Sequence, residues 1–141
     1  DHDGLSLLKK YLNIEFVTGD KNGFSISKKR IVYDMKFKLH LVSTIKRVEW
    51  IKKKYNLNEV IYMGDGIFDH YVMKEVFYSI APKNAHPFAK QTCNFITESK
   101  GSEGAVAEAC LHLLDKFFEK YDMNKPLKFN TKSEKFGEWQ A

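Results

Sequence analysis

Short apolar runs, separated by longer stretches with a helical repeat, constrain the fold of this chain more than any other feature. Runs of this length are typical of buried strands, and their alternation with helices predicts parallel strands joined by crossover helices. The runs cover residues 14–17, 39–42, 60–63, 78–80 and 94–96. We therefore expect an α/β protein, a Rossmann-like three-layer αβα sandwich with a mostly parallel sheet.

The stretches between these runs supply the predicted helices. Apolar residues recur at three- and four-residue intervals over 26–35 and 46–55. The clearest helix is predicted over 104–121, where the apolar residues fall on one stripe and the charged residues fall elsewhere. These helices are expected to cover the sheet.

Length and composition favour one soluble domain. The chain has 141 residues, of which 43% are hydrophobic, enough for one compact core. We expect residues 1–121 to form that core and residues 122–141 to form a C-terminal tail. No apolar run reaches the roughly 18 residues needed to cross a bilayer. Cys93 and Cys110 form no Cys-x-x-Cys pair, so we expect a cytoplasmic protein without a disulfide framework and without a membrane segment.

The net charge of +5 is compatible with an anionic partner. Nucleic-acid binding proteins usually concentrate their basic residues in one patch or stripe. Here the lysines are scattered along the chain, as on solvated helix faces, and we expect no nucleic-acid partner. A small phosphorylated metabolite suits the same positive charge.

In open parallel sheets, ligands bind outside the carboxyl ends of the strands. Thr18 and Gly19 follow the first apolar run, and a hydroxyl beside a glycine with accessible backbone N–H groups can cradle a phosphoryl oxygen. Lys46 follows the second run and could hold the same phosphate. Each feature also has a simpler explanation. Thr18-Gly19 could be a common Thr-Gly turn, and Lys46 could be one exposed lysine among many.

The segment after the third run carries two carboxylates. Asp65 comes at the end of the predicted strand, between Gly64 and Gly66, and Asp69 follows one helical turn later. Carboxylate oxygens are the ligands that a hard cation such as Mg²⁺ prefers. An ordinary Asp-Gly turn with Asp69 as a helix cap is the alternative, but the position at a strand end favours a metal site.

Two later segments are weaker candidates for substrate binding. His86 follows the fourth run and precedes a proline, and Gly101 and Ser102 precede the last predicted helix. Glycines there would let backbone N–H groups approach an anion. The same residues could equally form a turn and a helix cap.

Taken together, these segments resemble the haloacid dehalogenase superfamily. Thr18-Gly19, Lys46 and the segment 64–69 are similar, in order and spacing, to its second, third and fourth motifs. The segments 85–87, 95–97 and 101–108 resemble the closing third of the 3-deoxy-manno-octulosonate 8-phosphate phosphatases and the related C-terminal domain of acylneuraminate cytidylyltransferases.

The resemblance implies a capless, magnesium-dependent phosphatase. Its members transfer the phosphoryl group to an aspartate and then hydrolyse the aspartyl-phosphate. By resemblance, Thr18 and Lys46 would be catalytic and would bind the phosphate together with Gly19. Asp65 would hold Mg²⁺. Asp69 would share the metal, or would support the site without touching the metal. Capless relatives complete their sites with a neighbouring subunit, so a homotetramer is implied.

The family's nucleophile and a second aspartate, two positions on, lie at the end of a first strand. Asp1 and Asp3 spell this motif, but no apolar run precedes them. The segment 3–8 aligns better with the helix that precedes the second motif. We therefore expect the nucleophile strand to lie upstream of Asp1 in a longer parent chain, or to be lost, and we expect no normal turnover from this segment alone.

Departures from the sugar-acid phosphatase pattern leave two functions open. Asp20, itself a candidate substrate-binding residue, stands where an arginine is usual, Gly66 replaces a second aspartate, and Ala107 replaces another arginine. Losing arginines should weaken carboxylate recognition. The leading hypothesis is a phosphatase acting on a small phosphorylated sugar or sugar acid. The alternative is a catalytically silent domain of the same fold that drives oligomerisation beside an acylneuraminate cytidylyltransferase.

Overall fold

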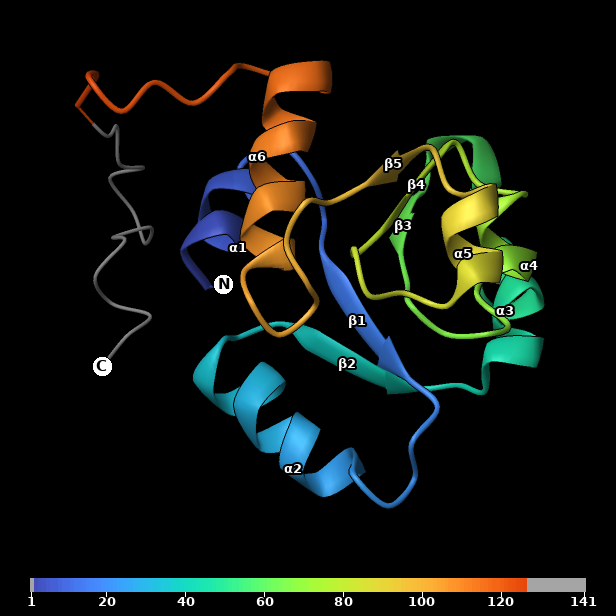
Figure 1. The fold of residues 1–141 in the computed structure, drawn as a ribbon. Helices are drawn as coiled ribbons and strands as arrows, with labels where there is room; N and C mark the ends of the chain where they lie inside the picture. Colours follow the sequence, from blue (N-terminus) through green and yellow to red (C-terminus); the bar gives the residue numbers. More distant parts are fainter. Residues whose placement is uncertain (1, 127–141) are drawn as a thin grey trace.

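The computed structural model describes residues 2–126, apart from the side chain of Ile26. Strands and helices alternate along this part of the chain (Figure 1). Most of the predicted tail, residues 127–141, lies outside the described residues.

The first half of the chain contributes two strands and the helices around them. These elements are α1 (His2–Leu8), β1 (Glu15–Thr18), α2 (Phe24–Lys28), the π-helical η1 (Lys29–Asp34), β2 (Lys38–Leu41), the 3₁₀ turn η2 (Thr44–Lys46), α3 (Arg47–Lys54) and the 3₁₀ turn η3 (Leu57–Glu59). Only one helical segment and one strand separate Thr18 from Lys46, so no cap domain is inserted there, as expected.

The second half contributes three strands and three helices within the described residues. These elements are β3 (Ile61–Met63), α4 (His70–Met73), β4 (Tyr78–Ala81), α5 (Pro87–Thr92), β5 (Phe95–Ile96) and α6 (Ala105–Phe117). All five predicted strands are confirmed, each within one residue of its predicted ends. The last helix ends four residues earlier than predicted because Phe118 leaves the helical region, with φ −131° and ψ −140°.

Every strand pair is parallel, which confirms the predicted α/β architecture. β1 pairs with β2, with Val17 opposite His40. β4 lies between β3 and β5. The structure adds one feature that the sequence analysis did not anticipate. The described strands form two sheets, β1-β2 and β3-β4-β5, instead of one.

A gap separates the two sheets, and we call the space between β1 and β3 the slot. Two cavities of about 270 and 390 Å³ lie there, and Glu15, Phe16 and Val17 of β1 and Ile61 and Tyr62 of β3 line both of them. β4 is buried along its whole length, whereas β1 is only partly buried throughout. The facing edges of β1 and β3 are therefore the open edges of the two sheets.

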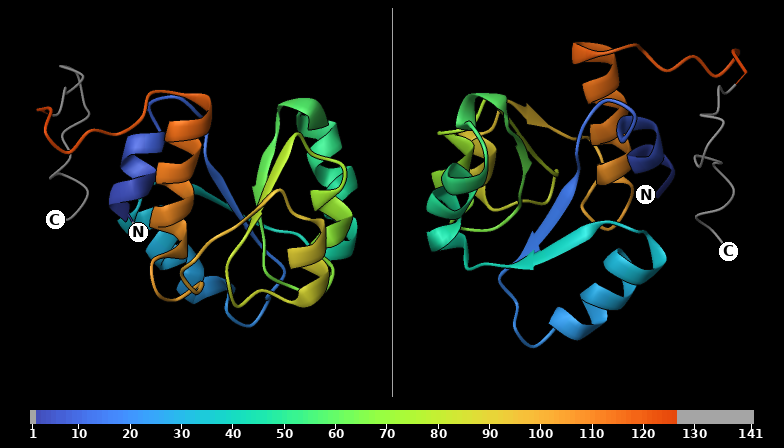
Figure 2. Two further views of the ribbon diagram at one scale, coloured as in Figure 1. Left: turned by 45° about the horizontal axis from the view of Figure 1, so that its top comes forward. Right: turned by 180° about the vertical axis from the view of Figure 1, so that it is seen from behind.

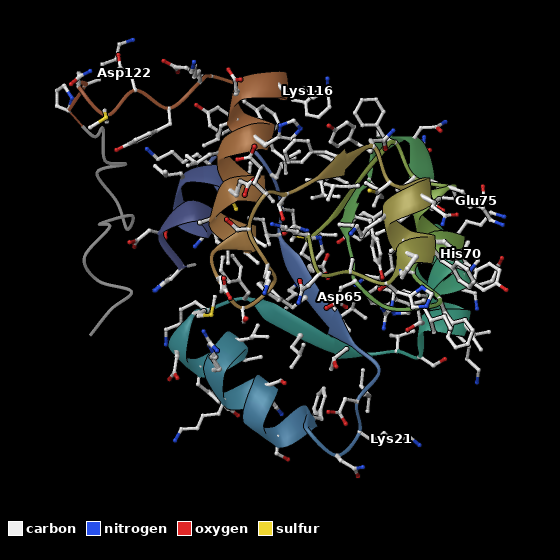
Figure 3. All side chains as sticks on the ribbon, viewed as in Figure 1. Lys21, Asp65, His70, Glu75, Lys116 and Asp122 are labelled. Carbon is white, nitrogen blue, oxygen red and sulfur yellow. The ribbon has the colours of Figure 1, made fainter. Side chains whose placement is uncertain are left out.

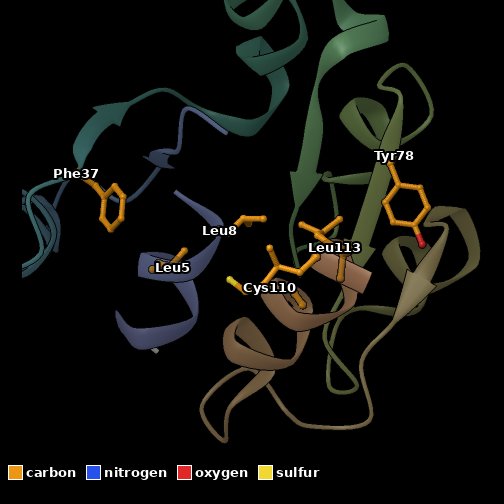
Figure 4. Packing of buried hydrophobic residues seen from close by; sticks show 9 residues of the cluster. Leu5, Leu8, Phe37, Tyr78, Cys110 and Leu113 are labelled. Atoms are coloured by element: carbon orange, nitrogen blue, oxygen red, sulfur yellow. The ribbon is translucent and has the colours of Figure 1, made fainter. Parts of the chain in front are cut away.

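Helices cover both faces of the strands in three layers (Figure 2). α1 packs against α6 on one side, and their buried residues Leu5, Leu8, Cys110 and Leu113 form one core cluster with Ile80 of β4 (Figure 4). A second cluster joins α3, α4 and α5 on the other side, and its members include Ile51, Tyr62, Val72, Met73 and Ala89. These two apolar layers fix the strand ends that carry the candidate residues.

Helix α1 confirms the prediction that the segment beginning at Asp3 is helical. It precedes β1 and packs on α6, so it sits where a crossover helix covers a parallel sheet. Among residues 2–126, no helix is long and apolar enough to span a bilayer.

Candidate active site

The candidate residues lie at the carboxyl ends of β1, β2 and β3. Arg47 connects these ends. Its Nη2 donates to the backbone oxygen of Val42, just past β2, at 2.7 Å, and its Nη1 donates to the hydroxyl of Tyr62 in β3 at 2.8 Å. A Cβ placed on Gly19, just past β1, would lie 3.7 Å from Nη2. The rims of the two sheets therefore meet at one guanidinium group.

Thr18 and Gly19 occupy the predicted position at the end of β1. The Thr18 hydroxyl accepts a hydrogen bond from the backbone N–H of Asp20 at 3.2 Å. A hydroxyl that accepts in this way still has its own proton to donate, so Thr18 can bind an anionic oxygen. Asp20 accepts from the backbone N–H groups of Asn22 and Gly23, each at 3.0 Å, and thus holds a local turn.

The segment from Gly64 to Asp69 forms a tight turn folded around a buried carboxylate. Asp69 is 5% exposed. Its Oδ2 accepts from the Gly66 N–H at 2.7 Å, and its Oδ1 accepts from the Tyr62 hydroxyl at 2.5 Å and lies 3.4 Å from Arg47 Nη1. Both carboxylate oxygens of Asp69 are therefore engaged within the protein.

Asp65, in contrast, presents its carboxylate to solvent at the mouth of the slot. It lines the larger slot cavity together with Val17 and Gly101, and Figure 3 shows it near the middle of the molecule beside β1. Its backbone oxygen accepts from the His86 N–H at 2.8 Å. Among residues 2–126, no side chain is hydrogen-bonded or ion-paired to the Asp65 carboxylate, which leaves its oxygens available to a ligand.

The weaker candidates lie on the adjoining loops. His86 is the N-cap of α5, and its Nδ1 accepts from the Phe88 N–H at 3.1 Å. The Gly101 N–H donates to the Asn84 side chain at 2.8 Å, and Ser102 is exposed in the turn before α6. Contacts from Asp65 to His86 and from Asn84 to Gly101 thus bring the late loops to the same rim.

The two neighbouring cations Lys46 and Arg47 have different surroundings. Lys46, the predicted phosphate ligand, ends η2 and is exposed. Arg47, which the sequence analysis did not single out, is 6% exposed. One signal could have identified it, because Arg47 lies four residues before the buried Ile51 and thus on the buried stripe of α3.

The buried network fixes the protonation state of Tyr62. Burial, reinforced by the negative charge of Asp69, raises the pKa of the Tyr62 hydroxyl far above its usual value, although Arg47 opposes this shift. The hydroxyl therefore stays protonated and donates to Asp69 at any ordinary pH.

The donor set fits a Mg²⁺ ion that shares its ligands with a phosphate. Mg²⁺ is commonly held by one or two carboxylates, several waters and substrate phosphate oxygens. Asp65 offers one such carboxylate. Within the described part of the chain, no cluster of three or more His, Cys, Asp or Glu side chains is arranged to hold a metal ion by side chains alone.

Sequence comparison identifies similarity to a protein family and, over a shorter stretch, to an individual phosphatase. Residues 42–110 match the family model of the haloacid dehalogenase-like hydrolases. A stretch of 52 residues is 40% identical to the 3-deoxy-D-manno-octulosonate 8-phosphate phosphatase of Yersinia pestis. This stretch covers 37% of this chain and 28% of that relative. The match therefore spans less than a third of the curated relative's length.

Solved structures of such phosphatases share the fold. The crystal structure of the Yersinia pestis phosphatase superposes with a TM-score of 0.65 and 26% identity, over 80% of this chain and 64% of that one. The Moraxella catarrhalis phosphatase, solved with a magnesium ion, a phosphate ion and a KDO molecule, superposes with a TM-score of 0.64 and 21% identity, over 81% and 68%. The expected resemblance and the haloacid dehalogenase-like fold are both confirmed.

Proposed function

From its similarity to the haloacid dehalogenase-like hydrolases in sequence and fold, we infer that the chain is the larger part of a phosphatase core. We propose that the complete protein is a magnesium-dependent phosphomonoester hydrolase. Its substrate would be a small phosphorylated sugar or sugar acid, and the reaction would pass through an aspartyl-phosphate. The core would comprise residues 1–121, with residues 122–141 as a tail.

One observation carries this proposal. Thr18-Gly19 at the end of β1 and the Asp65 turn at the end of β3 belong to different sheets, yet the contacts of Arg47 bring both strand ends to one rim. The Thr18 hydroxyl and the Gly19 N–H would bind phosphoryl oxygens, and Lys46 would add positive charge. Asp65 would hold the magnesium ion, which lowers the negative charge facing the nucleophile.

The reaction also needs a carboxylate nucleophile. In the first step, its oxygen would form a bond to phosphorus while the ester P–O bond breaks, and the departing sugar oxygen would take a proton from water. In the second step, the oxygen of a water molecule would form a bond to phosphorus while the P–O bond to the carboxylate breaks, which releases inorganic phosphate, returns a proton to the solvent and restores the carboxylate. We propose that a strand filling the slot supplies this group, because the slot opens at the rim beside Asp65.

The walls of the slot suit one buried strand. Trp50 and Ile51 line one of its cavities, and Leu8 and Leu113 line the other. A strand with apolar walls on both faces has apolar side chains at successive positions, as central strands of parallel sheets do. Helix α1 would then be the crossover between that strand and β1.

A catalytically silent domain that drives oligomerisation is the alternative. Two features of the turn after β3 favour this alternative: the buried oxygens of Asp69 are already hydrogen-bonded, and Gly66 offers no carboxylate. The retention of Thr18, Lys46 and Asp65 at strand ends favours the enzyme, since assembly has no chemical need for all three.

Phosphate release by the complete protein tests the proposal. We expect magnesium-dependent hydrolysis of p-nitrophenyl phosphate and faster hydrolysis of one member of a panel of phosphorylated sugars and sugar acids. Asp65→Ala should abolish it at ordinary magnesium concentration. Asp115→Ala, which removes an exposed carboxylate on α6, is the matched control and should leave the rate unchanged. No phosphate release from any substrate, or full activity in Asp65→Ala, would contradict the assignment.

By the same resemblance we propose a cytoplasmic homotetramer. Phe68, Tyr71 and Phe88 are 42%, 42% and 49% exposed on the segment that carries α4 and α5, and exposed aromatic residues are common at subunit contacts. Light scattering coupled to gel filtration would measure the mass directly, and a monomer at micromolar concentration would contradict the proposal.

A further inference from the structure

Arg47 is an unusual residue for the interior of this protein. Arginine is seldom buried unless its charge is paired, yet Arg47 is 6% exposed at the first position of α3. Its neighbours in sequence do not share this environment, since Lys46 is exposed and Val48 is partly buried. The burial of this charge therefore calls for a specific role.

The contacts of Arg47 extend to both sheets. Nη2 binds the Val42 oxygen at the rim of the β1-β2 sheet, and Nη1 binds Tyr62 in the β3-β4-β5 sheet. β1 and β3 are not paired with each other. The guanidinium group is thus a polar link between the two sheets.

Asp69 carries this link onward to the turn that holds Asp65. Oδ1 of Asp69 faces Arg47 and Tyr62, and Oδ2 accepts from the Gly66 N–H. Gly66 is the residue directly after Asp65. A movement of Arg47 would therefore change the turn that sets the direction of the Asp65 carboxylate.

We propose that Arg47 is a positioning residue, which acts through Tyr62 and Asp69 to hold the Asp65 turn at a fixed place relative to Thr18 and Gly19. In this arrangement Asp69 supports the turn and is not a metal ligand, because its oxygens are committed to hydrogen bonds. Lys46 remains the cation that is free to approach a phosphate from solvent.

The hydrogen-bonding capacity of Arg47 is not exhausted. Its Nε is buried and has no hydrogen-bond partner among the described residues. A buried donor without an acceptor is destabilising, and such a group in a native fold calls for an explanation, of which a role at a functional site is one.

Amide hydrogen exchange of Gly66 tests the proposal without any metal or substrate. In Arg47→Met we expect the Gly66 N–H to exchange about tenfold faster, since Asp69 loses the cation that helps to hold its carboxylate in place to accept this hydrogen bond. Arg47→Lys should give an intermediate rate, because an ammonium group keeps the charge but cannot reach both sheets as a planar fork does. Arg30→Met, which removes an exposed arginine, is the matched control and should leave the rate unchanged.

Tyr62→Phe keeps the test decisive if Arg47→Met fails to fold. It removes one hydroxyl from the middle of the network and keeps the ring that packs in the core. Faster Gly66 exchange in Tyr62→Phe with an unchanged circular dichroism spectrum supports the proposal. Wild-type exchange at Gly66 in Tyr62→Phe and in every folded Arg47 variant would overturn it.

Metal binding distinguishes a positioning residue from a metal ligand. Only this metal-binding experiment rests on the proposed function. With Mn²⁺ as the probe, followed by electron paramagnetic resonance, Asp65→Asn should abolish binding. Arg47→Met and Asp69→Asn should weaken it by about tenfold, as the loss of a supporting residue does. Equal and complete loss in Asp65→Asn and Asp69→Asn would make Asp69 a ligand and refute its supporting role. If the wild-type protein binds no Mn²⁺, the proposed function fails while the Gly66 exchange result still stands.

Discussion

The carboxylate of Asp69 lies directly against Gly64. A Cβ on Gly64 would stand 2.5 Å from Asp69 Cγ and 2.9 Å from Asp69 Cβ, distances that real Cβ atoms do not adopt. The absence of a side chain at Gly64 is therefore what allows the turn to close over its buried carboxylate.

Gly64→Ala should destabilise the protein because Asp69 cannot move aside without breaking its bonds to Tyr62 and Gly66. We expect a loss of about 1–3 kcal/mol in the free energy of unfolding, as for other forced contacts in a packed interior. Urea unfolding followed by circular dichroism would measure it.

Gly101→Ala is the control for this substitution. Its new Cβ would be 3.5 Å from the nearest atom, an ordinary contact with the Asn84 side chain. The free energy of unfolding should change by less than about 1 kcal/mol, because a tolerated glycine-to-alanine change acts mainly on the unfolded chain. Equal effects at the two glycines would show that the close approach at Gly64 has no energetic consequence.

The slot gives a second prediction, for the backbone of β1 and β3. Thr18 and Gly64 direct their backbone groups toward β2 and β4, where they bond Val42 and Ile80. Because successive residues in a strand point to opposite edges, Val17 and Met63 direct theirs into the slot. If a strand fills it in the complete protein, the Val17 and Met63 amides should exchange more slowly there than in residues 1–141 alone, because ladder hydrogen bonds protect amides.

The Val72 amide serves as the internal reference for that comparison, since it donates to the backbone oxygen of Asp69 at the start of α4 and does not face the slot. Unchanged exchange at Val17 and Met63, with Val72 also unchanged, would mean that no strand enters the slot.

Much of this architecture could be predicted from local patterns. The runs at 60–63 and 78–80 became adjacent parallel strands because short apolar segments have few other ways to bury their backbone groups. The gap between β1 and β3 could not be predicted. The apolar pattern of residues 14–17 indicates a strand in the interior, but it does not indicate which strands lie beside it. Pairing partners depend on tertiary topology rather than on the local sequence.

A polar cluster at the start of β1 gives a prediction for acid stability. Glu15 receives hydrogen bonds from Tyr55, from Lys54 at 3.1 Å and from the His40 ring at 2.6 Å. Burial alone would raise the pKa of Glu15, but these bonds outweigh it and lower the pKa from 4.5 to about 2. A carboxylate with a lowered pKa stabilises the fold fully above its unfolded pKa, and this contribution is lost as the pH falls from 4.5 toward 2.

Thermal melting across that pH interval would test the cluster. The wild-type protein should lose stability on acidification, whereas Glu15→Gln should be less stable near neutral pH and should lose less on acidification. Glu119→Gln, at an exposed position after α6, should follow the wild-type curve. A Glu15→Gln curve parallel to that of the wild type would rule out Glu15 as the source of the pH dependence.

The site could be predicted only in part. The positions of Thr18, Gly19 and Asp65 at the ends of strands were predicted because they directly follow apolar runs, and parallel strands bring such ends to one edge. Arg47 and Tyr62 were missed because a cation in a lysine-rich helix and an aromatic residue in a strand are ordinary features of a sequence. The spacing of Arg47 from Ile51 could have indicated that Arg47 is buried, but the role we propose for the two residues depends on a hydrogen-bonded network between two sheets, which no local pattern encodes.

Paramagnetic broadening by Mn²⁺ in the presence of inorganic phosphate tests most directly whether residues from two sheets share one metal-phosphate site. In the ¹⁵N-labelled complete protein we predict simultaneous loss of the Thr18, Gly19 and Asp65 amide signals. In the Asp65→Asn variant we predict none of these losses. Broadening around Asp65 that leaves Thr18 and Gly19 sharp would contradict the account, as would broadening that persists at all three residues in Asp65→Asn.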